Sequence, residues 1–79
     1  MSDMGEVTLF TQPGCGPCAA VKGQLTRRRI PFVTVDVSVD EGAAALLRAN
    51  GCVGTPVLRY GGTFYRTPTQ IFEWIRGRS

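Results

Sequence analysis

Two cysteines separated by two residues lie between a short apolar run and a stretch with helical periodicity. The apolar run covers residues 7–10, residues 11–14 have the composition of a loop, and the cysteines are Cys15 and Cys18. Pro17 suits the first turn of a helix, where its missing backbone N–H costs little. This segment therefore predicts a strand, a loop and a helix that opens at the cysteine pair, and it constrains the fold more than any other feature of the chain.

The rest of the chain alternates between strand-like and helix-like segments. The first helix is expected over residues 17–29, because Ile30 precedes a proline and such a residue avoids the α region. A second helix, rich in alanine and leucine, should run to about Asn50, and a third should end at Gly77. Strands are expected at residues 32–37, 56–60 and 63–65.

Two segments have the composition of a capping box, in which the side chains of the first and fourth residues bond to each other's backbone N–H. In the first, Ser38 should cap the second helix and Glu41 should reach back to it. In the other, Thr67 and Gln70 should play these parts for the third helix. Gly51 should take the left-handed conformation just beyond the second helix.

The predicted order is βαβαββα. The first strand–helix–strand unit should be parallel with a right-handed crossover. A two-residue turn at residues 61–62 should join the last two strands as a hairpin. We expect an α/β fold in which three helices flank a four-stranded mixed sheet, formed as a single domain by residues 1–79.

Composition and charge narrow the function classes. The net charge is +3, and the one basic run, residues 27–29, falls at a helix end, where cations suit the helix dipole, and contains no aromatic residue. We therefore expect no nucleic-acid partner. No apolar run approaches the roughly 20 residues of a membrane span. Residues 1–5 lack the features of a signal peptide, so we expect a cytoplasmic protein without a membrane partner.

The cysteine pair has the spacing of a redox-active dithiol. Two cysteines one helical turn apart can form a disulfide with little backbone movement. The N–H groups and dipole of the helix start should stabilise a thiolate at Cys15, which makes this residue the expected nucleophile. Cys18, one turn deeper, is the expected resolving thiol. Gly16 leaves room for a substrate chain, and Pro17 stiffens the loop.

A metal site is the alternative interpretation of these cysteines. A structural zinc ion takes four ligands, but Cys52 is the one remaining thiol and the chain has no histidine. We therefore expect no metal and no bound cofactor other than the Cys15–Cys18 disulfide. Cys52 is expected to act as a small buried apolar residue. Trp74 shares helical spacing with two isoleucines, so it is expected to face the core.

Two segments carry a resemblance to a known family. Residues 10–18, Phe-Thr-Gln-Pro-Gly-Cys-Gly-Pro-Cys, resemble the active-site segment of glutaredoxins and NrdH-redoxins, with the Gly-Pro pair of thioredoxins. Residues 51–56 resemble the Gly-x-x-Gly-x-Pro segment of thioredoxins. The resemblance covers essentially the whole chain and implies a thioredoxin fold with a cis peptide bond between Thr55 and Pro56, packed beside the cysteines. It implies an active-site loop of Gln12, Pro13, Gly14, Gly16 and Pro17 around the catalytic Cys15 and Cys18, and substrate binding by Thr55 and Pro56.

Departures from the motifs favour one branch of the superfamily. Gln12 replaces the lysine usual in glutaredoxins and NrdH-redoxins, and residues 60–66 lack the acids with which glutaredoxins hold glutathione. Gly14 and Leu9 replace the tryptophan and aspartate of thioredoxins. Residues 68–71 match the Pro-x-x-Ile of NrdH-redoxins, although the usual Trp-Ser-Gly-Phe-Arg before it is absent. The chain therefore most resembles an NrdH-redoxin.

This resemblance implies an electron carrier that reduces protein disulfides. Its electrons would come from thioredoxin reductase and pass to ribonucleotide reductase, and we expect a monomer. Three alternatives stay open. The protein could be a glutathione-dependent glutaredoxin, a metal or iron–sulfur protein built on Cys15, or a binding module whose cysteines are idle.

Overall fold

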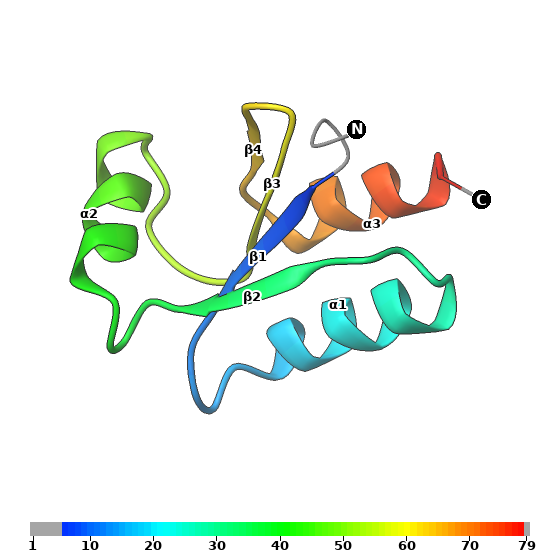
Figure 1. The fold of residues 1–79 in the computed structure, drawn as a ribbon, viewed down its shortest axis with the longest axis horizontal. Helices are drawn as coiled ribbons and strands as arrows, with labels where there is room; N and C mark the ends of the chain where they lie inside the picture. Colours follow the sequence, from blue (N-terminus) through cyan, green and yellow to red (C-terminus); the bar gives the residue numbers. More distant parts are fainter. Residues whose placement is uncertain (1–5, 79) are drawn as a thin grey trace.

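The computed structural model describes residues 6–78, which form four strands and three helices in the predicted order (Figure 1). The elements are β1 (Val7–Thr11), α1 (Gly16–Arg27), β2 (Val33–Asp36), α2 (Glu41–Ala49), β3 (Val57–Tyr60), β4 (Thr63–Tyr65) and α3 (Pro68–Arg76). The signal-peptide inference concerns residues 1–5, which lie outside the described residues. Within residues 6–78, every helix is too short or too polar to span a membrane.

The four strands form one mixed sheet in the order β2-β1-β3-β4. β1 and β2 are parallel, whereas β1–β3 and β3–β4 are antiparallel, so the predicted sheet is confirmed. The hairpin turn at residues 61–62 is also confirmed, because both glycines have positive φ, at 58° and 85°. In the β1–β3 ladder, Phe10 lies opposite Val57.

The sheet has a core on each face, because neighbouring residues of a strand point to opposite sides. Leu9 belongs to the larger core, which α1 and α3 cover, and Phe10 belongs to the smaller core under α2. Figure 1 shows α1 and α3 together and α2 apart from them. Trp74 is only 9% exposed and lies in the larger core, which confirms its predicted position. The guanidinium of Arg78 lies over the Trp74 ring, 4.5 Å from its centroid.

The two predicted capping boxes differ in outcome. Thr67 caps α3 as expected, because its Oγ1 accepts a hydrogen bond of 3.1 Å from the Gln70 N–H. The Gln70 side chain accepts instead from the Arg66 N–H, one residue before the cap, at 2.8 Å. The helix start is therefore confirmed, with the reciprocal bond displaced by one residue.

The Ser38 cap is wrong, because a competing turn engages this residue. The N–H and hydroxyl of Ser38 both donate to Asp36 Oδ1, at 2.8 and 2.6 Å. These bonds hold the pKa of the Asp36 carboxyl below its usual range. Asp40 caps α2 instead, since its Oδ1 accepts a 2.9 Å bond from the Ala43 N–H. The helix therefore begins two residues later than predicted.

Other strand and helix ends also differ from the predictions. α1 ends at Arg27 rather than at Arg29, which takes the left-handed conformation with φ of 60°. The N–H groups of Arg29 and Ile30 donate to the carbonyls of Thr26 and Leu25, at 3.1 and 3.0 Å. This is a Schellman ending with arginine in the place that glycine usually takes. Gly51 has φ of 75° after α2, as predicted, and β2 is shorter than residues 32–37.

We predict that Arg29→Gly raises the free energy of unfolding by about 0.5–1 kcal/mol, because glycine adopts positive φ without a Cβ penalty. Arg27→Gly, within the last turn of α1, is the matched control and should lower this free energy by a similar amount. Urea denaturation of both variants checks the prediction. A loss of stability in Arg29→Gly would contradict the strained ending.

We predict that Asp40→Ala destabilises the protein by about 1 kcal/mol, because it removes the cap of α2. Ser38→Ala should cost less, since its bonds to Asp36 are exposed and lie outside the helix. Thermal unfolding of the two variants at neutral pH gives the comparison. A larger loss of thermal stability in Ser38→Ala than in Asp40→Ala would instead support Ser38 as the cap of α2.

Candidate active site

The cysteine pair lies where the chain leaves β1 and enters α1. Gly14, with φ of 78°, turns the loop, and Cys15 is the N-cap residue of α1. The Cys18 N–H donates to Cys15 Sγ at 3.1 Å, so a sulfur takes the part that a serine or aspartate oxygen plays at most caps. The two Cα atoms are 5.2 Å apart, and the sulfurs form a disulfide.

The two cysteines differ in accessibility. Cys15 is half-buried, whereas Cys18 is 1% exposed and lies on the buried face of α1 with Val21 and Leu25. A Cβ on Gly16 would meet no atom within 4 Å, so the space beside this residue is open. An incoming disulfide can therefore approach Cys15 and is kept from Cys18.

The start of α1 is suited to hold negative charge on Cys15 in the reduced state. The backbone N–H of Cys18 points at the sulfur, and the helix dipole acts in the same direction. Both effects favour a thiolate over a thiol. The position of the usual family lysine is held by the neutral, exposed Gln12, so this stabilisation depends on the backbone.

The Thr55–Pro56 peptide bond is cis, as the resemblance implied. Pro56 is buried and Thr55 is half-buried, just before the β1–β3 ladder begins at Val57. The hydroxyl oxygen of Thr55 is buried and has no hydrogen-bond partner within residues 6–78. Such orphaned buried polar atoms are uncommon, and this one lies in a pocket wall.

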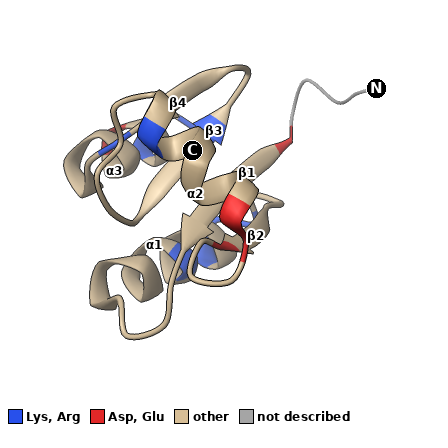
Figure 2. Cartoon of the chain, turned by 90° about the vertical axis from the view of Figure 1, so that its left-hand side faces the viewer, with Lys and Arg blue, Asp and Glu red and all other residues tan. Residues whose placement is uncertain are grey.

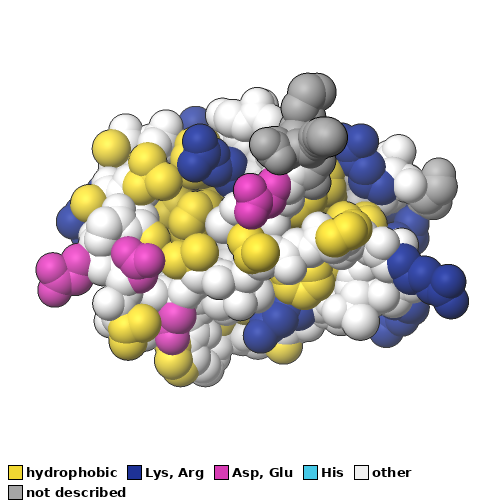
Figure 3. Space-filling view, in the orientation of Figure 1, with side chains coloured by type: hydrophobic (Ala, Val, Ile, Leu, Met, Phe, Trp, Pro, Cys, Tyr) yellow, Lys and Arg dark blue, Asp and Glu magenta, His cyan; other side chains and the backbone are white. Residues whose placement is uncertain are grey.

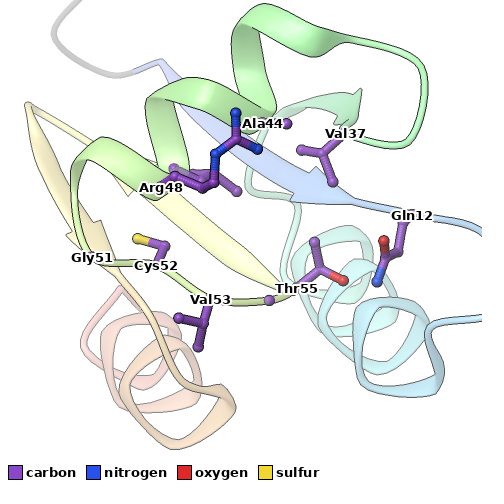
Figure 4. A pocket seen from close by; sticks show the side chains of 10 residues that line it. Gln12, Val37, Ala44, Arg48, Gly51, Cys52, Val53 and Thr55 are labelled. Atoms are coloured by element: carbon purple, nitrogen blue, oxygen red, sulfur yellow. The ribbon is translucent and has the colours of Figure 1, made fainter.

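A pocket of about 510 Å³ lies between α2, the segment after it and the loop before Cys15. Figure 4 shows Gln12 and Thr55 on one side, with their polar atoms toward each other, and Arg48 of α2 on the other. The volume is within the usual range of ligand pockets. The lining residues are Gln12, Val37, Ala44, Leu47, Arg48, Gly51, Cys52, Val53, Gly54 and Thr55.

Sequence reasoning found part of this site and missed part of it. It identified Gln12 and Thr55, but it gave no role to Arg48, whose helical spacing from Ala44 was the available signal. Cys52 is 3% exposed and packs in the smaller core, so its predicted burial is confirmed, although it also lines the pocket. Among residues 6–78, no group of three or more metal-ligating side chains comes together.

The chain is similar in sequence to known proteins. The glutaredoxin family model matches residues 7–65. The N-acetyl-S-hydroxy-L-cysteine reductase of Bacillus subtilis (strain 168) is 33% identical over 73 residues, which are 90% of this chain and 78% of that protein.

Two solved structures also match. The first is NrdH-redoxin from Escherichia coli, a glutaredoxin-like protein with a thioredoxin-like activity profile. It aligns with a TM-score of 0.76 and 28% identity, over 86% of this chain and 92% of that one. Glutaredoxin from Brucella melitensis aligns with a TM-score of 0.72 and 25% identity, over 91% and 79% of the two chains. Together with the cysteine pair at the start of α1, these matches show that the chain belongs to the glutaredoxin family and is a thiol–disulfide oxidoreductase with a thioredoxin fold.

Proposed function

We propose that this protein is a dithiol electron carrier that reduces disulfides in other proteins. The Cys15 thiolate attacks one sulfur of the substrate disulfide, and the other sulfur leaves as a thiolate and takes a proton. Cys18 then loses its proton and attacks Cys15 Sγ in the mixed disulfide. The second substrate thiol is released, and two electrons have left the protein, which now holds the Cys15–Cys18 disulfide.

The unequal exposure of the two cysteines is the observation that carries this proposal. The half-buried Cys15 caps α1, where its thiolate is stabilised, and so it suits the nucleophile. The buried Cys18 is within disulfide distance of Cys15 but away from solvent, which suits a resolving thiol. An idle pair would require neither the sulfur cap nor the open space beside Gly16.

We propose that the substrate chain lies along Thr55 and Pro56. The segment at Thr55 precedes the β1–β3 ladder, so an extended substrate strand can pair with the Thr55 backbone. We propose that the exposed loop residues Gln12, Pro13 and Gly14 face this path, and that the exposed Gly16 and Pro17 border it beside Cys15.

Thioredoxin reductase is the electron donor that we propose, and ribonucleotide reductase is the proposed acceptor. The similarity to NrdH-redoxin, whose activity profile is thioredoxin-like, supports this pairing. So does the absence of an acid from residues 60–66, since glutathione needs an anionic partner for its ammonium group. The protein would act as a monomer in the cytoplasm.

A second candidate is the reduction of a small sulfenic acid. The Bacillus subtilis relative is named for such a substrate, an N-acetylated one, which has a carboxylate and no ammonium group. Within residues 6–78, the lining of the pocket beside Gln12 contains Arg48 and no carboxylate, which suits the negative charge of this substrate. The Cys15 thiolate would attack the sulfenic sulfur and release hydroxide, which takes a proton to form water. Cys18 would then displace the thiol product.

We predict NADPH-driven disulfide reduction with thioredoxin reductase and none with glutathione and glutathione reductase. Cys15→Ser should abolish turnover, because the nucleophile is lost, whereas Cys18→Ser should accumulate a mixed disulfide with the substrate. NADPH consumption and mass spectrometry of the trapped species measure these outcomes. Turnover with glutathione alone would instead identify a glutathione-dependent glutaredoxin, and silence with both donors would refute the proposed carrier.

For the second candidate, we predict that reduced protein mixed with the sulfenic acid of N-acetylcysteine, formed in situ, loses its Cys15 and Cys18 thiols within the mixing time. Thiol titration after rapid quenching measures this loss. The same reaction with peroxide alone is the control, and equal rates in the two reactions would exclude a sulfenic-acid reductase.

A further inference from the structure

The charge in the pocket beside the active-site loop is of one sign, positive. Among the described residues, Arg48 is the charged side chain in its wall, and no carboxylate lines it. A second cation lies close by, since Arg66 Nη1 is 3.6 Å from the position that a Cβ on Gly51 would take. Figure 3 shows hydrophobic side chains gathered on the α2 side of the molecule, with basic atoms beside them. The pocket therefore offers an apolar wall with positive charge at its edge.

Arg48 has no hydrogen-bond or ion-pair partner among residues 6–78. Its side chain is exposed. A guanidinium presents five N–H donors in a planar fork that matches the two oxygens of a carboxylate. Arg48 is thus free to pair with an acid that a substrate brings into the pocket.

The opposite wall is suited to a polypeptide. The Gln12 amide can donate and accept hydrogen bonds, and the buried Thr55 hydroxyl lacks a partner within residues 6–78. The Val53 side chain, which lines the pocket, is fully exposed to solvent. An exposed apolar side chain beside unpaired polar groups is typical of a surface that a protein segment covers.

We propose that this pocket binds the part of a protein substrate that flanks its reactive disulfide, and that Arg48 selects substrates with an acidic side chain in that part. This inference rests on the proposed function and names a feature of its substrates. Arg48 does not contact the reacting sulfurs, so it acts on substrate binding and leaves the exchange chemistry unchanged.

Free glutathione fits the same pocket less well than an acidic protein segment. Glutathione carries an ammonium group beside its carboxylates, and the described residues of the pocket wall supply the cation Arg48 but no anion to pair with that ammonium group. An acidic side chain within a polypeptide has no neighbouring ammonium group. Its backbone can also pair with the Thr55 segment, in the way that an extended strand joins a sheet.

The test uses two disulfide-cyclised peptides that differ only in one residue next to the first cysteine, which is glutamate in one and glutamine in the other. Reduced protein is mixed with each peptide in a single turnover, and the reduced peptide is quantified by chromatography, so no electron donor is needed. We expect the glutamate peptide to react about fivefold faster at low salt. The attraction between an exposed arginine and a carboxylate is weak, and added salt screens it further.

The variants isolate Arg48 from net charge. Arg48→Gln should react equally with both peptides, and Arg48→Lys should recover part of the preference. Arg27→Gln removes the same charge at the far end of α1, about 18 Å from Cys15 for a helix of this length. Figure 2 shows basic residues on several elements, so this control matters. It should keep the full preference.

Each other outcome has a distinct meaning. Equal rates for the two peptides with the unsubstituted protein, or an unchanged preference in Arg48→Gln, would overturn this inference alone. So would an equal loss in Arg27→Gln, which would indicate general charge steering. An equal effect of Arg48→Gln on glutathione disulfide would assign the pocket to glutathione. No reaction with either peptide would overturn both this inference and the proposed protein-disulfide reduction.

Discussion

The hydrogen bond from the Cys18 N–H to Cys15 Sγ, 3.1 Å long, is the contact on which the rest of the site depends. It makes the reactive sulfur the N-cap of α1, and so the sulfur lies at the positive end of the helix dipole. The same bond fixes the two cysteines one turn apart. One local feature therefore provides both the stabilisation of the thiolate and the geometry of disulfide closure.

The sheet register brings the second half of the site to this helix start. Phe10 pairs with Val57 in the antiparallel β1–β3 ladder. Continuing that register past the strand ends brings the segment at Gln12 next to the segment at Thr55, which explains why these two residues line the same pocket. Residues distant in sequence thus meet because Leu9 and Phe10 must enter opposite cores, and a slip of one residue would exchange those cores.

Local signals predicted most of the fold, and the misses have physical causes. The cysteine pair, Pro68 and the two glycines at residues 61–62 each act through their own backbone, so their effects were visible in the sequence. Ser38 failed as a cap because Asp36, two residues earlier, competes for it. Arg29 was unforeseen as a left-handed residue because the Schellman bonds, rather than a glycine, set its conformation.

The residues of the candidate site likewise fall into those that a local sequence signal predicts and those that only the packing of the fold reveals. Cys15, Cys18 and Thr55 were predictable because short motifs carry them, whereas Arg48 becomes part of the site only when α2 packs over the smaller core. The helix presents Leu47 to that core and so directs the next residue, Arg48, to the pocket edge.

The burial of Cys18 has a consequence for the order of events. Burial keeps the Cys18 sulfur from solvent, whereas the half-buried Cys15 lies at the helix start, where the Cys18 N–H points at its sulfur. A substrate disulfide therefore meets one reactive sulfur rather than two competing ones. Once Cys15 is engaged in a mixed disulfide, the Cys18 N–H no longer faces a charged sulfur. Cys18 lies one helical turn from Cys15, with the two Cα atoms 5.2 Å apart in the disulfide form, so it is the thiol placed to attack Cys15 Sγ.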